Sequence, residues 1–291
     1  MIYIASEGMG SWGDGIILHL FKIMGIEAQF KNCPEAKILI RSMFFNHEAE
    51  FNNSNIPYIT WIGESVYPPH RSYPPLFELL TFNSYRKGEF ILPYFISVYF
   101  EMQTKLNMTF DMNDLRLDKN PNRHFMLAYC ASNPQYHRDT LFKLIQKEEK
   151  TAHGLGKCMG TPGYQVGEHS TWRDNWSYYR NYRFAIAMEN KAIGGYVTEK
   201  LLNTILGGAI PIYYGDPTWV KQNFNEKAII FVQDFSSLEE CASYILHVDK
   251  TPQLLKQYQS QPVFVKKPEL FSITNPCDEY KKMCEIIKSV I

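Results

Sequence analysis

The chain has 291 residues, a length that allows two α/β domains or one large domain with a substantial apolar core. Hydrophobic residues make up 45% of the chain and charged residues 21%, as in an ordinary globular protein. The net charge is zero, which excludes a general electrostatic field for nucleic acid or a membrane surface, so any phosphate must be bound by a local site.

Cysteine usage and hydropathy bear on where the chain resides. The six cysteines are scattered, without a CxxC pair or a zinc-type spacing, which favours free thiols in a reducing compartment. The first residues, MIYIASEGMG, have neither the basic region nor the long apolar region of a secretory signal. No apolar run approaches the roughly 18 residues that a membrane-spanning helix needs. We therefore expect a soluble, cytoplasmic chain without a transmembrane segment.

In the first part of the chain, short apolar runs alternate with a helical pattern. The segments 2–6, 36–40 and 58–63 have the character of buried strands, and 14–25 has the period of a helix. The polar segment 111–123 is rich in Asn, Asp and Lys, which is typical of an interdomain linker. We therefore expect an α/β domain that ends near this linker.

The second part of the chain repeats the alternation more regularly. Apolar runs predict strands at 124–130, 184–189, 209–215 and 229–233. Amphipathic patterns predict helices at 135–149, 196–206, 217–224 and 236–249, and one more helix from Asp278 onward. Such a run of βα units predicts a parallel sheet with helices on both faces.

These patterns together predict an α/β fold of two similar halves that share a cleft. We place an N-terminal domain at 1–115, a C-terminal domain at 116–275 and a C-terminal helix at 276–291. Open α/β sheets bind ligands at the carboxyl ends of their strands, so functional residues are expected there.

The densest chemical signal follows the predicted strand 184–189. Glu189 and Asn190 stand at its carboxyl end, and Thr198 is positioned to cap the next helix, whose first turn contains Glu199 and Lys200. A helix dipole disfavours a cation in that turn, so an anion bound from outside the protein would explain Lys200. Glu199 would offer a bidentate acceptor for ribose hydroxyls. An ordinary capped helix with an exposed Glu–Lys pair explains the pattern equally well.

Arg138 is a second cation near a predicted helix start, after the strand 124–130 and the turn ASNPQY. A single arginine in such a place is typical of a solvated surface. Together with Lys200, however, it suggests a cradle for a diphosphate. The chain has no Asp-x-Asp pair, no phosphate-binding loop with Gly-Lys-Ser/Thr and no complete Gly-x-Gly-x-x-Gly fingerprint. Side-chain cations rather than a bound metal are therefore expected to stabilise a departing diphosphate.

In the first half of the chain, Glu64 is the carboxylate that invites a catalytic role. It follows the strand 58–63 and lies in the sequence between Trp61 and Tyr67. Desolvation by aromatic neighbours could raise its pKa and suit it to general base catalysis. A surface glutamate in a proline-rich loop is the alternative, and this half of the chain alone favours the alternative.

The stretch YRFAIAMENKAIGGYVTEKLLNTILGGAIPIYYGDP resembles the alpha-1,3-fucosyltransferases of glycosyltransferase family 10. Their hallmark is a strand ending Phe-Glu-Asn, a short loop, Tyr-Val/Ile-Thr-Glu-Lys, a helix and a further strand. The segments ASNPQYHR, WIGES and GSWGD resemble other elements of the family less tightly. The resemblance therefore covers most of the chain and is strongest in the second half.

The resemblance implies a GT-B architecture, in which two Rossmann-like domains face a cleft. It implies that the C-terminal domain holds GDP-fucose and the N-terminal domain holds an oligosaccharide or glycoconjugate acceptor. The implied reaction is an inverting transfer from GDP-β-L-fucose to a sugar hydroxyl, often the 3-OH of a GlcNAc-type residue. No metal site and no required cofactor are expected, although Mn²⁺ or Mg²⁺ carried by the diphosphate could stimulate the reaction. No nucleic acid partner is expected.

The family's functional residues can be carried over position by position. The resemblance assigns Glu64 as the general base, and it assigns Arg138 and Lys200 to the diphosphate. The predicted donor-binding residues are Arg138, Asn190, Tyr196, Thr198, Glu199 and Lys200, and further candidates are Ser132, Asn133, Lys157 and Glu189.

The chain departs from the family pattern at Met188, where the family has Phe, and at Lys191, where Ser is frequent. Two other interpretations remain. The chain could be a GT-B glycosyltransferase that uses a different nucleotide sugar, or a non-catalytic carbohydrate-binding protein on the same scaffold. The sequence does not identify the acceptor, the linkage or the oligomeric state.

Overall fold

The computed structural model describes residues 1–8, 14–42, 56–63, 74–81, 89–105, 115, 117, 123–166, 174–264 and 269–291. The chain divides into two compact units. The N-terminal unit comprises Met1–Thr109, Ile193–Tyr196 and Pro268–Ile291, and the C-terminal unit comprises Phe110–Ala192 and Val197–Lys267. The C-terminal helix is thus grouped with the first part of the chain, and a short loop from the second part is grouped there too.

The described residues of the N-terminal unit form a six-stranded parallel sheet with the strand order β2-β1-β3-β4-β5-β6. Its strands are β1 (Ile2–Glu7), β2 (Ala28–Phe30), β3 (Ile38–Ser42), β4 (Tyr58–Ile62), β5 (Glu78–Leu80) and β6 (Glu89–Ile91). Its helices are α1 (Asp14–Ile23), α2 (Tyr94–Lys105) and α9 (Asp278–Lys288), with a short 3-10 turn, η3 (Glu269–Phe271). The predicted strands β1, β3 and β4 and the predicted helices α1 and α9 are confirmed.

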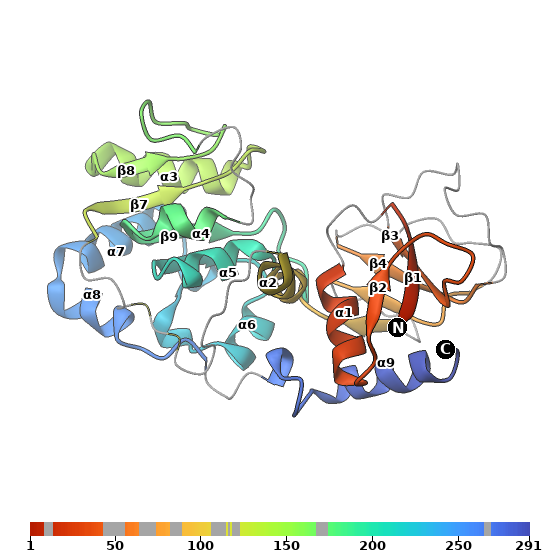
Figure 1. Ribbon diagram of the computed structural model, residues 1–291. Coiled ribbons are helices and arrows are strands. Elements are labelled where there is room, and N and C mark those ends of the chain that lie inside the picture. Colours follow the sequence, from red (N-terminus) through yellow and green to blue (C-terminus); the bar gives the residue numbers. More distant parts are fainter. Residues whose placement is uncertain are drawn as a thin grey trace. The chain divides into compact units, whose positions relative to one another are not determined.

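The C-terminal helix α9 packs against α1 (Figure 1). The thiol of Cys284 donates to the carbonyl of Leu20 at 3.5 Å. The ring of His19 stacks on Phe100 of α2 with centroids 3.7 Å apart and meets the ring of Tyr280 edge-on. Burial, assisted by the charge of Lys22, lowers the pKa of His19 to about 3, so this imidazole is neutral at physiological pH.

The C-terminal unit contains a five-stranded parallel sheet with the order β11-β10-β9-β7-β8. Its strands are β7 (Phe125–Tyr129), β8 (Ala152–Gly154), β9 (Tyr182–Met188), β10 (Ile210–Tyr214) and β11 (Ile230–Phe231). Its helices are α3 (Tyr136–Glu148), α4 (Asn175–Tyr179), α5 (Glu199–Leu206), α6 (Pro217–Asn223), α7 (Leu238–Lys250) and α8 (Pro252–Gln259), with the 3-10 turns η1 (Glu226–Ala228) and η2 (Val232–Asp234).

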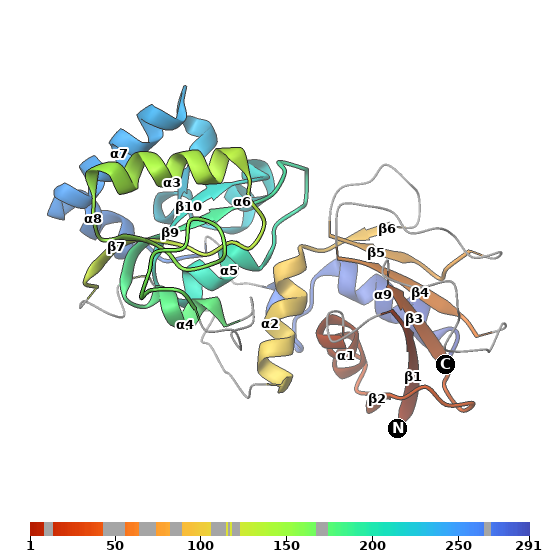
Figure 2. The ribbon, with the colours of Figure 1, turned by 90° about the horizontal axis from the view of Figure 1, so that it is seen from above.

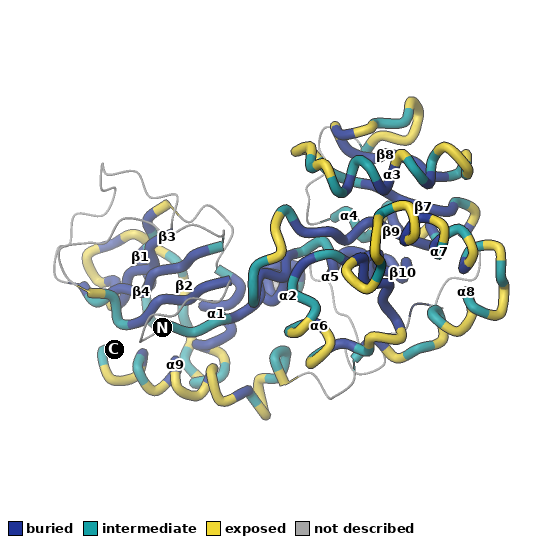
Figure 3. Tube along the Cα trace, turned by 180° about the vertical axis from the view of Figure 1, so that it is seen from behind, coloured by how far each residue is buried: buried dark blue, intermediate teal, exposed yellow. Residues whose placement is uncertain are grey.

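Helices cover both faces of the C-terminal sheet, as the run of βα units predicts. Figure 2 shows α3 and α7 on one side of the sheet and α4 and α5 on the other. Figure 3 shows the central strands as buried, whereas α8 has no buried residue. The expected α/β class, with parallel sheets, is therefore confirmed.

The order of the C-terminal sheet reverses between β7 and β9. The strand β8 follows β7 in the chain and lies on one side of it, whereas β9 lies on the other side. Connections that leave two neighbouring parallel strands in opposite directions create the place where open α/β sheets bind ligands. The residues after β7 and after β9 are therefore the first to examine for a site.

Arg123, just before β7, is a buried arginine that donates to carbonyl groups at the C-terminal ends of α4 and α5, those of Tyr179 and Gly207. Its Nη1 donates to the carbonyls of Tyr182 at 2.8 Å and Gly207 at 3.1 Å, and its Nη2 donates to those of Gly207 at 3.1 Å and Leu117 at 3.4 Å. Gly208 has a φ of 69°, and a Cβ there would lie 2.3 Å from Nη2 of Arg123. Arg123 thus fixes the C-terminal end of α5, the helix that carries Lys200 at its other end.

Candidate functional site

The first turn of α3 is bonded to the carboxyl end of β9, at the point where the strand order reverses. Nε2 of His137 lies 3.0 Å from the carbonyl oxygen of Glu189, and Nη1 of Arg138 donates to the carbonyl of Met188 at 3.3 Å. The ring of His137 also lies against that of Tyr214, at the end of β10, with centroids 4.6 Å apart. The first turn of α3, which follows β7 in the chain, therefore contacts the ends of both β9 and β10.

Arg138 is buried, with 3% of its surface exposed, so it is not the solvated surface arginine that the sequence allowed as an alternative. Its Nη2 donates to the carbonyl of Asn133 at 2.9 Å, which anchors the turn after β7. Its Nε is buried and has no hydrogen-bond partner among the described residues. One donor of a buried cation is thus left over at the edge of the sheet.

Glu189, Thr198 and Lys200 form a closed set of hydrogen bonds. The carboxylate of Glu189 is fully buried, and it accepts from the backbone N–H of Thr198 at 2.7 Å and from the hydroxyl of Thr198 at 2.7 Å. Nζ of Lys200 donates to Oε2 of Glu189 at 3.1 Å and to Oγ1 of Thr198 at 2.9 Å. The second oxygen of Glu189 therefore lies between a hydroxyl and an ammonium group.

This arrangement gives Lys200 a counter-charge within the protein, which the sequence did not reveal. Burial alone would lower the pKa of Lys200, but the negative charges of Glu189 and Glu199 outweigh it and raise the pKa above its ordinary value. Burial raises the pKa of Glu189, and Lys200 and the two donors of Thr198 offset part of that effect. The cation in the first turn of α5 is thus compensated by a carboxylate of the protein itself.

Thr198 occupies the N-cap position, as expected, but its side chain makes no capping bond to the helix. Its hydroxyl and its N–H both donate to the carboxylate of Glu189, so this N–H is not part of an exposed anion site. Glu199 lies at 3.5 Å from Nζ of Lys200, a longer contact than that of Glu189, and its side chain is 16% exposed. The side chain of Lys200 is 22% exposed, so the protein does not enclose it completely.

The other predicted residues fall into different surroundings. Asn190 is partly exposed beside Glu189, whereas Ser132, Asn133 and Lys157 are exposed after β7 and β8. Tyr196 is grouped with the N-terminal unit, where it is buried with Ile62 and Leu80 in an apolar cluster. Glu64, the predicted general base, lies outside the described residues.

Two residues that shape the site were missed in the sequence. A Cβ at Gly215 would clash with the hydroxyl of Tyr213 and would lie 3.0 Å from Cγ of Glu189, so this position needs a glycine for the close approach of both side chains. The signal was present in the stretch IPIYYGDP, because a glycine after a strand often marks a close approach. His137 has no spacing in the sequence that connects it with Glu189.

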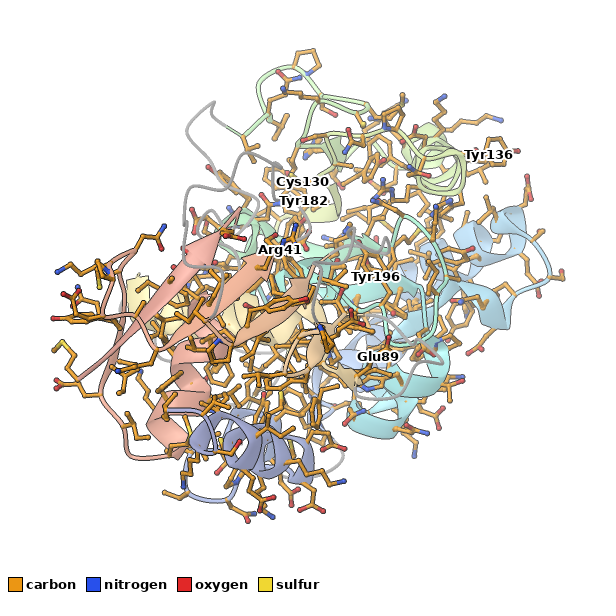
Figure 4. The ribbon with its side chains drawn as sticks, turned by 90° about the vertical axis from the view of Figure 1, so that its right-hand side faces the viewer. Arg41, Glu89, Cys130, Tyr136, Tyr182 and Tyr196 are labelled. Carbon is orange, nitrogen blue, oxygen red and sulfur yellow. The ribbon has the colours of Figure 1, made fainter. Side chains whose placement is uncertain are left out.

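Tyr136 is a third residue that no sequence pattern identified. It begins α3, one residue before His137, and 82% of its surface is exposed. Figure 4 shows it at the outer edge of the C-terminal unit.

Among the described residues there is no group of three or more His, Cys, Asp or Glu that could hold a metal ion. In the same part of the chain, no helix has the length and apolar character required to cross a membrane.

A profile described as "Glycosyltransferase family 10 (fucosyltransferase) C-term" matches residues 120–290, more than half of the chain. The segment contains β7 to β11 and all the hydrogen bonds described above for Arg138, Glu189, Thr198 and Lys200. The match therefore covers the edge at which these residues meet.

Named relatives match about half of the chain. An alpha-(1,3)-fucosyltransferase from Helicobacter pylori is 30% identical over 146 residues, which are 49% of this chain and 29% of the relative. A GDP-fucose protein O-fucosyltransferase 3 from Xenopus tropicalis is 32% identical over 141 residues, which are 45% of this chain and 29% of the relative. The aligned segments thus span less than a third of these relatives.

The fold extends the similarity to the whole chain. A crystal structure of an alpha1,3-fucosyltransferase with GDP has a TM-score of 0.70 and 19% sequence identity to the chain, and the similarity covers 99% of this chain and 89% of that one. At this identity the comparison concerns the fold, which is of the GT-B type, as the family resemblance implied.

Proposed function

The chain belongs to glycosyltransferase family 10, the fucosyltransferases, and from this premise we propose that it transfers L-fucose from GDP-β-L-fucose to a hydroxyl of a glycan acceptor. The observation that carries the proposal is the set of cations at the strand edge of the C-terminal unit. Arg138 follows β7 and Lys200 lies in the first turn of α5, and each is held by a hydrogen bond to Met188 or Glu189 at the end of β9. Two positioned cations at one edge suit a leaving diphosphate.

The hydrogen-bond donors of Lys200 support a role at the diphosphate. An ammonium group has three protons, and here two of them point to Glu189 and Thr198. The third proton is the one nearest to Glu199, over the longer contact of 3.5 Å. When Glu199 turns to the ribose hydroxyls of the donor, this proton of Lys200 becomes free for a phosphate oxygen. Ribose and diphosphate would then be bound by adjacent residues of one helical turn.

The chemistry of transfer requires a base as well as a stabilised leaving group. Inversion in a single displacement needs a group that removes the proton of the acceptor hydroxyl while the diphosphate leaves from the opposite face. We assign this role to Glu64, on the basis of its place in WIGES and the family resemblance. Loss of the diphosphate would be assisted by Arg138 and Lys200, whose charges are already in place before the reaction.

We propose a GlcNAc-type residue with a free 3-OH as the acceptor. The relative from Helicobacter pylori is named for alpha-(1,3) transfer, whereas the Xenopus relative is named for transfer to protein. An acceptor panel must therefore include N-acetyllactosamine, its 3-deoxy analogue and a peptide with free hydroxyl groups. Transfer to the first and loss of transfer to the second identify the 3-OH, and transfer to the peptide alone contradicts the glycan acceptor.

The donor is tested by thermal unfolding with a panel of nucleotides. GDP and GDP-fucose should raise the melting temperature, because a ligand that binds only the folded protein stabilises it. UDP-galactose and ADP serve as negative controls, and GDP-mannose tests the sugar. Stabilisation by UDP-galactose instead of GDP-fucose indicates another nucleotide sugar. Stabilisation by oligosaccharides without any nucleotide indicates a carbohydrate-binding protein.

A further inference from the structure

We propose that Glu189 is a positioning residue, whose buried carboxylate holds the ammonium group of Lys200 and the start of α5 in the arrangement that grips the departing diphosphate. The inference rests on the proposed function, and it replaces the expectation that Glu189 binds the donor directly. Both carboxylate oxygens of Glu189 are occupied by Thr198 and Lys200, and the residue has no exposed surface. Its effect on the reaction must therefore pass through its two partners.

The protons in this set of contacts can be assigned without conflict. The backbone N–H of Thr198 donates to Oε1 of Glu189, and the hydroxyl of Thr198 donates to Oε2. Nζ of Lys200 donates to the same Oε2 and to Oγ1 of Thr198, which can accept while it donates its own proton. Every donor finds an acceptor when Glu189 is ionised and Lys200 is protonated. A neutral carboxyl group would add a proton for which the set offers no acceptor.

The carboxylate of Glu189 is itself held from the backbone. The N–H of Glu189 donates to the carbonyl of Tyr214 at 2.7 Å, and its own carbonyl lies 3.0 Å from Nε2 of His137. Gly215 leaves the space that Cγ of Glu189 fills, since a Cβ there would lie 3.0 Å from that atom. The position of the carboxylate is therefore set by three neighbouring segments of the unit.

A lysine side chain has four rotatable bonds, and its ammonium group has no preferred direction of its own. In this site the contacts to Glu189 and Thr198, at 3.1 and 2.9 Å, direct two protons to these residues, and the third proton lies nearest to Glu199, over 3.5 Å. Preorganised charge stabilises a transition state because it does not have to be reoriented during the reaction. Without Glu189 the charge of Lys200 would remain, but its position would not be fixed.

The test compares Glu189→Gln with the exposed control Glu148→Gln on α3, in the full chain. Glutamine keeps the size of the side chain but removes the charge that attracts Lys200. We expect kcat for fucosyl transfer to fall about 100-fold, the loss typical of a catalytic group that is displaced by an ångström. The Kd of GDP should change less than about threefold, because the charges of Arg138 and Lys200 remain. A loss confined to Kd, or no loss of kcat, overturns the inference.

A double-mutant cycle with Lys200→Ala separates positioning from a structural role. If Glu189 acts through Lys200, then adding Glu189→Gln to Lys200→Ala leaves kcat unchanged, whereas losses that multiply overturn the inference. Lys200→Ala alone leaves a buried carboxylate without its cation, so the double variant should melt at a higher temperature than Lys200→Ala. A lower melting temperature of the double variant contradicts the pairing.

Glu189→Asp provides the same test where the glutamine variant does not fold. It keeps the charge on a shorter side chain, and we expect its kcat to lie between those of the wild type and of Lys200→Ala. A kcat equal to that of the wild type overturns the inference. A wild-type chain that transfers no fucose overturns the proposed function itself. An active wild type with an equally active Glu189→Gln variant overturns only the role of Glu189.

Discussion

Replacing Arg123 by Met should destabilise the C-terminal unit more than any exposed substitution in it. The guanidinium group is buried and donates to the carbonyls of Leu117, Tyr179, Tyr182 and Gly207. Methionine preserves much of the apolar stem, but these carbonyls lose a charged donor. Hydrogen bonds to charged groups contribute about 1.5–3 kcal/mol each, and a buried acceptor left without its donor costs about 1–3 kcal/mol. Because several carbonyls are affected at once, while the cost of burying the charge of Arg123 is removed, we expect a decrease of about 3–5 kcal/mol in the free energy of unfolding.

The assay is urea unfolding followed by tryptophan fluorescence, with the exposed Lys143→Met as the matched control. Gly208→Ala tests the same contact from the other side, because its Cβ would meet Nη2 of Arg123 and its φ of 69° disfavours a side chain. Both variants should lower the denaturation midpoint, while Lys143→Met should leave it almost unchanged. A loss below about 1 kcal/mol for Arg123→Met would show that the carbonyls find other donors, and it would refute this reasoning.

Three further predictions concern the site and the N-terminal unit. Glu64→Gln should lower kcat about 10²- to 10⁴-fold and leave GDP binding intact, and substantial turnover would contradict its role as a base. Lys200→Ala should weaken GDP binding about 10- to 100-fold by calorimetry, and an unchanged Kd would contradict its contact with phosphate. Because the pKa of His19 falls from 6.5 to about 3 in the folded chain, unfolding should become easier by about 1.4 kcal/mol per pH unit as pH falls below 6.5. His19→Phe should remove this part of the pH dependence, and an unchanged pH profile would contradict it.

Regular βα alternation made the C-terminal unit predictable. The predicted strands at 124–130, 184–189 and 209–215 correspond to β7, β9 and β10, because long apolar runs bounded by glycines and polar turns have few other interpretations. Strand β8 was missed because it has three residues, too few for a period to be visible. The short β5 and β6 of the N-terminal unit escaped for the same reason.

The candidate site was predicted as a set of residues but not as a set of contacts. Lys200 and Arg138 were located through their unfavourable places at helix starts, and both lie at the predicted edge of the sheet. The sequence could not show that Glu189 would neutralise Lys200, because spacing along the chain does not fix which way two side chains turn. It also could not show that the hydroxyl of Thr198 would donate to Glu189 and make no capping bond to α5.

Tyr196 illustrates the same limit of sequence pattern. The family resemblance assigns it to the donor, and in the structure it is buried in an apolar cluster with Ile62 and Leu80. A tyrosine can fill a core or bind a ligand, and its neighbours in space decide between these roles. Those neighbours come from β4 and β5, more than a hundred residues earlier in the chain.

The central claim is transfer of fucose from GDP-fucose, and the most direct measurement is an NMR time course of the wild-type chain with GDP-β-L-fucose and N-acetyllactosamine. The β-anomeric signal of the donor should decline while an α-fucosyl signal appears, linked to the 3-OH of the GlcNAc residue. Free GDP should accumulate at the same rate. Release of free fucose without a linked product, or no consumption of GDP-fucose over the acceptor panel, would contradict the claim.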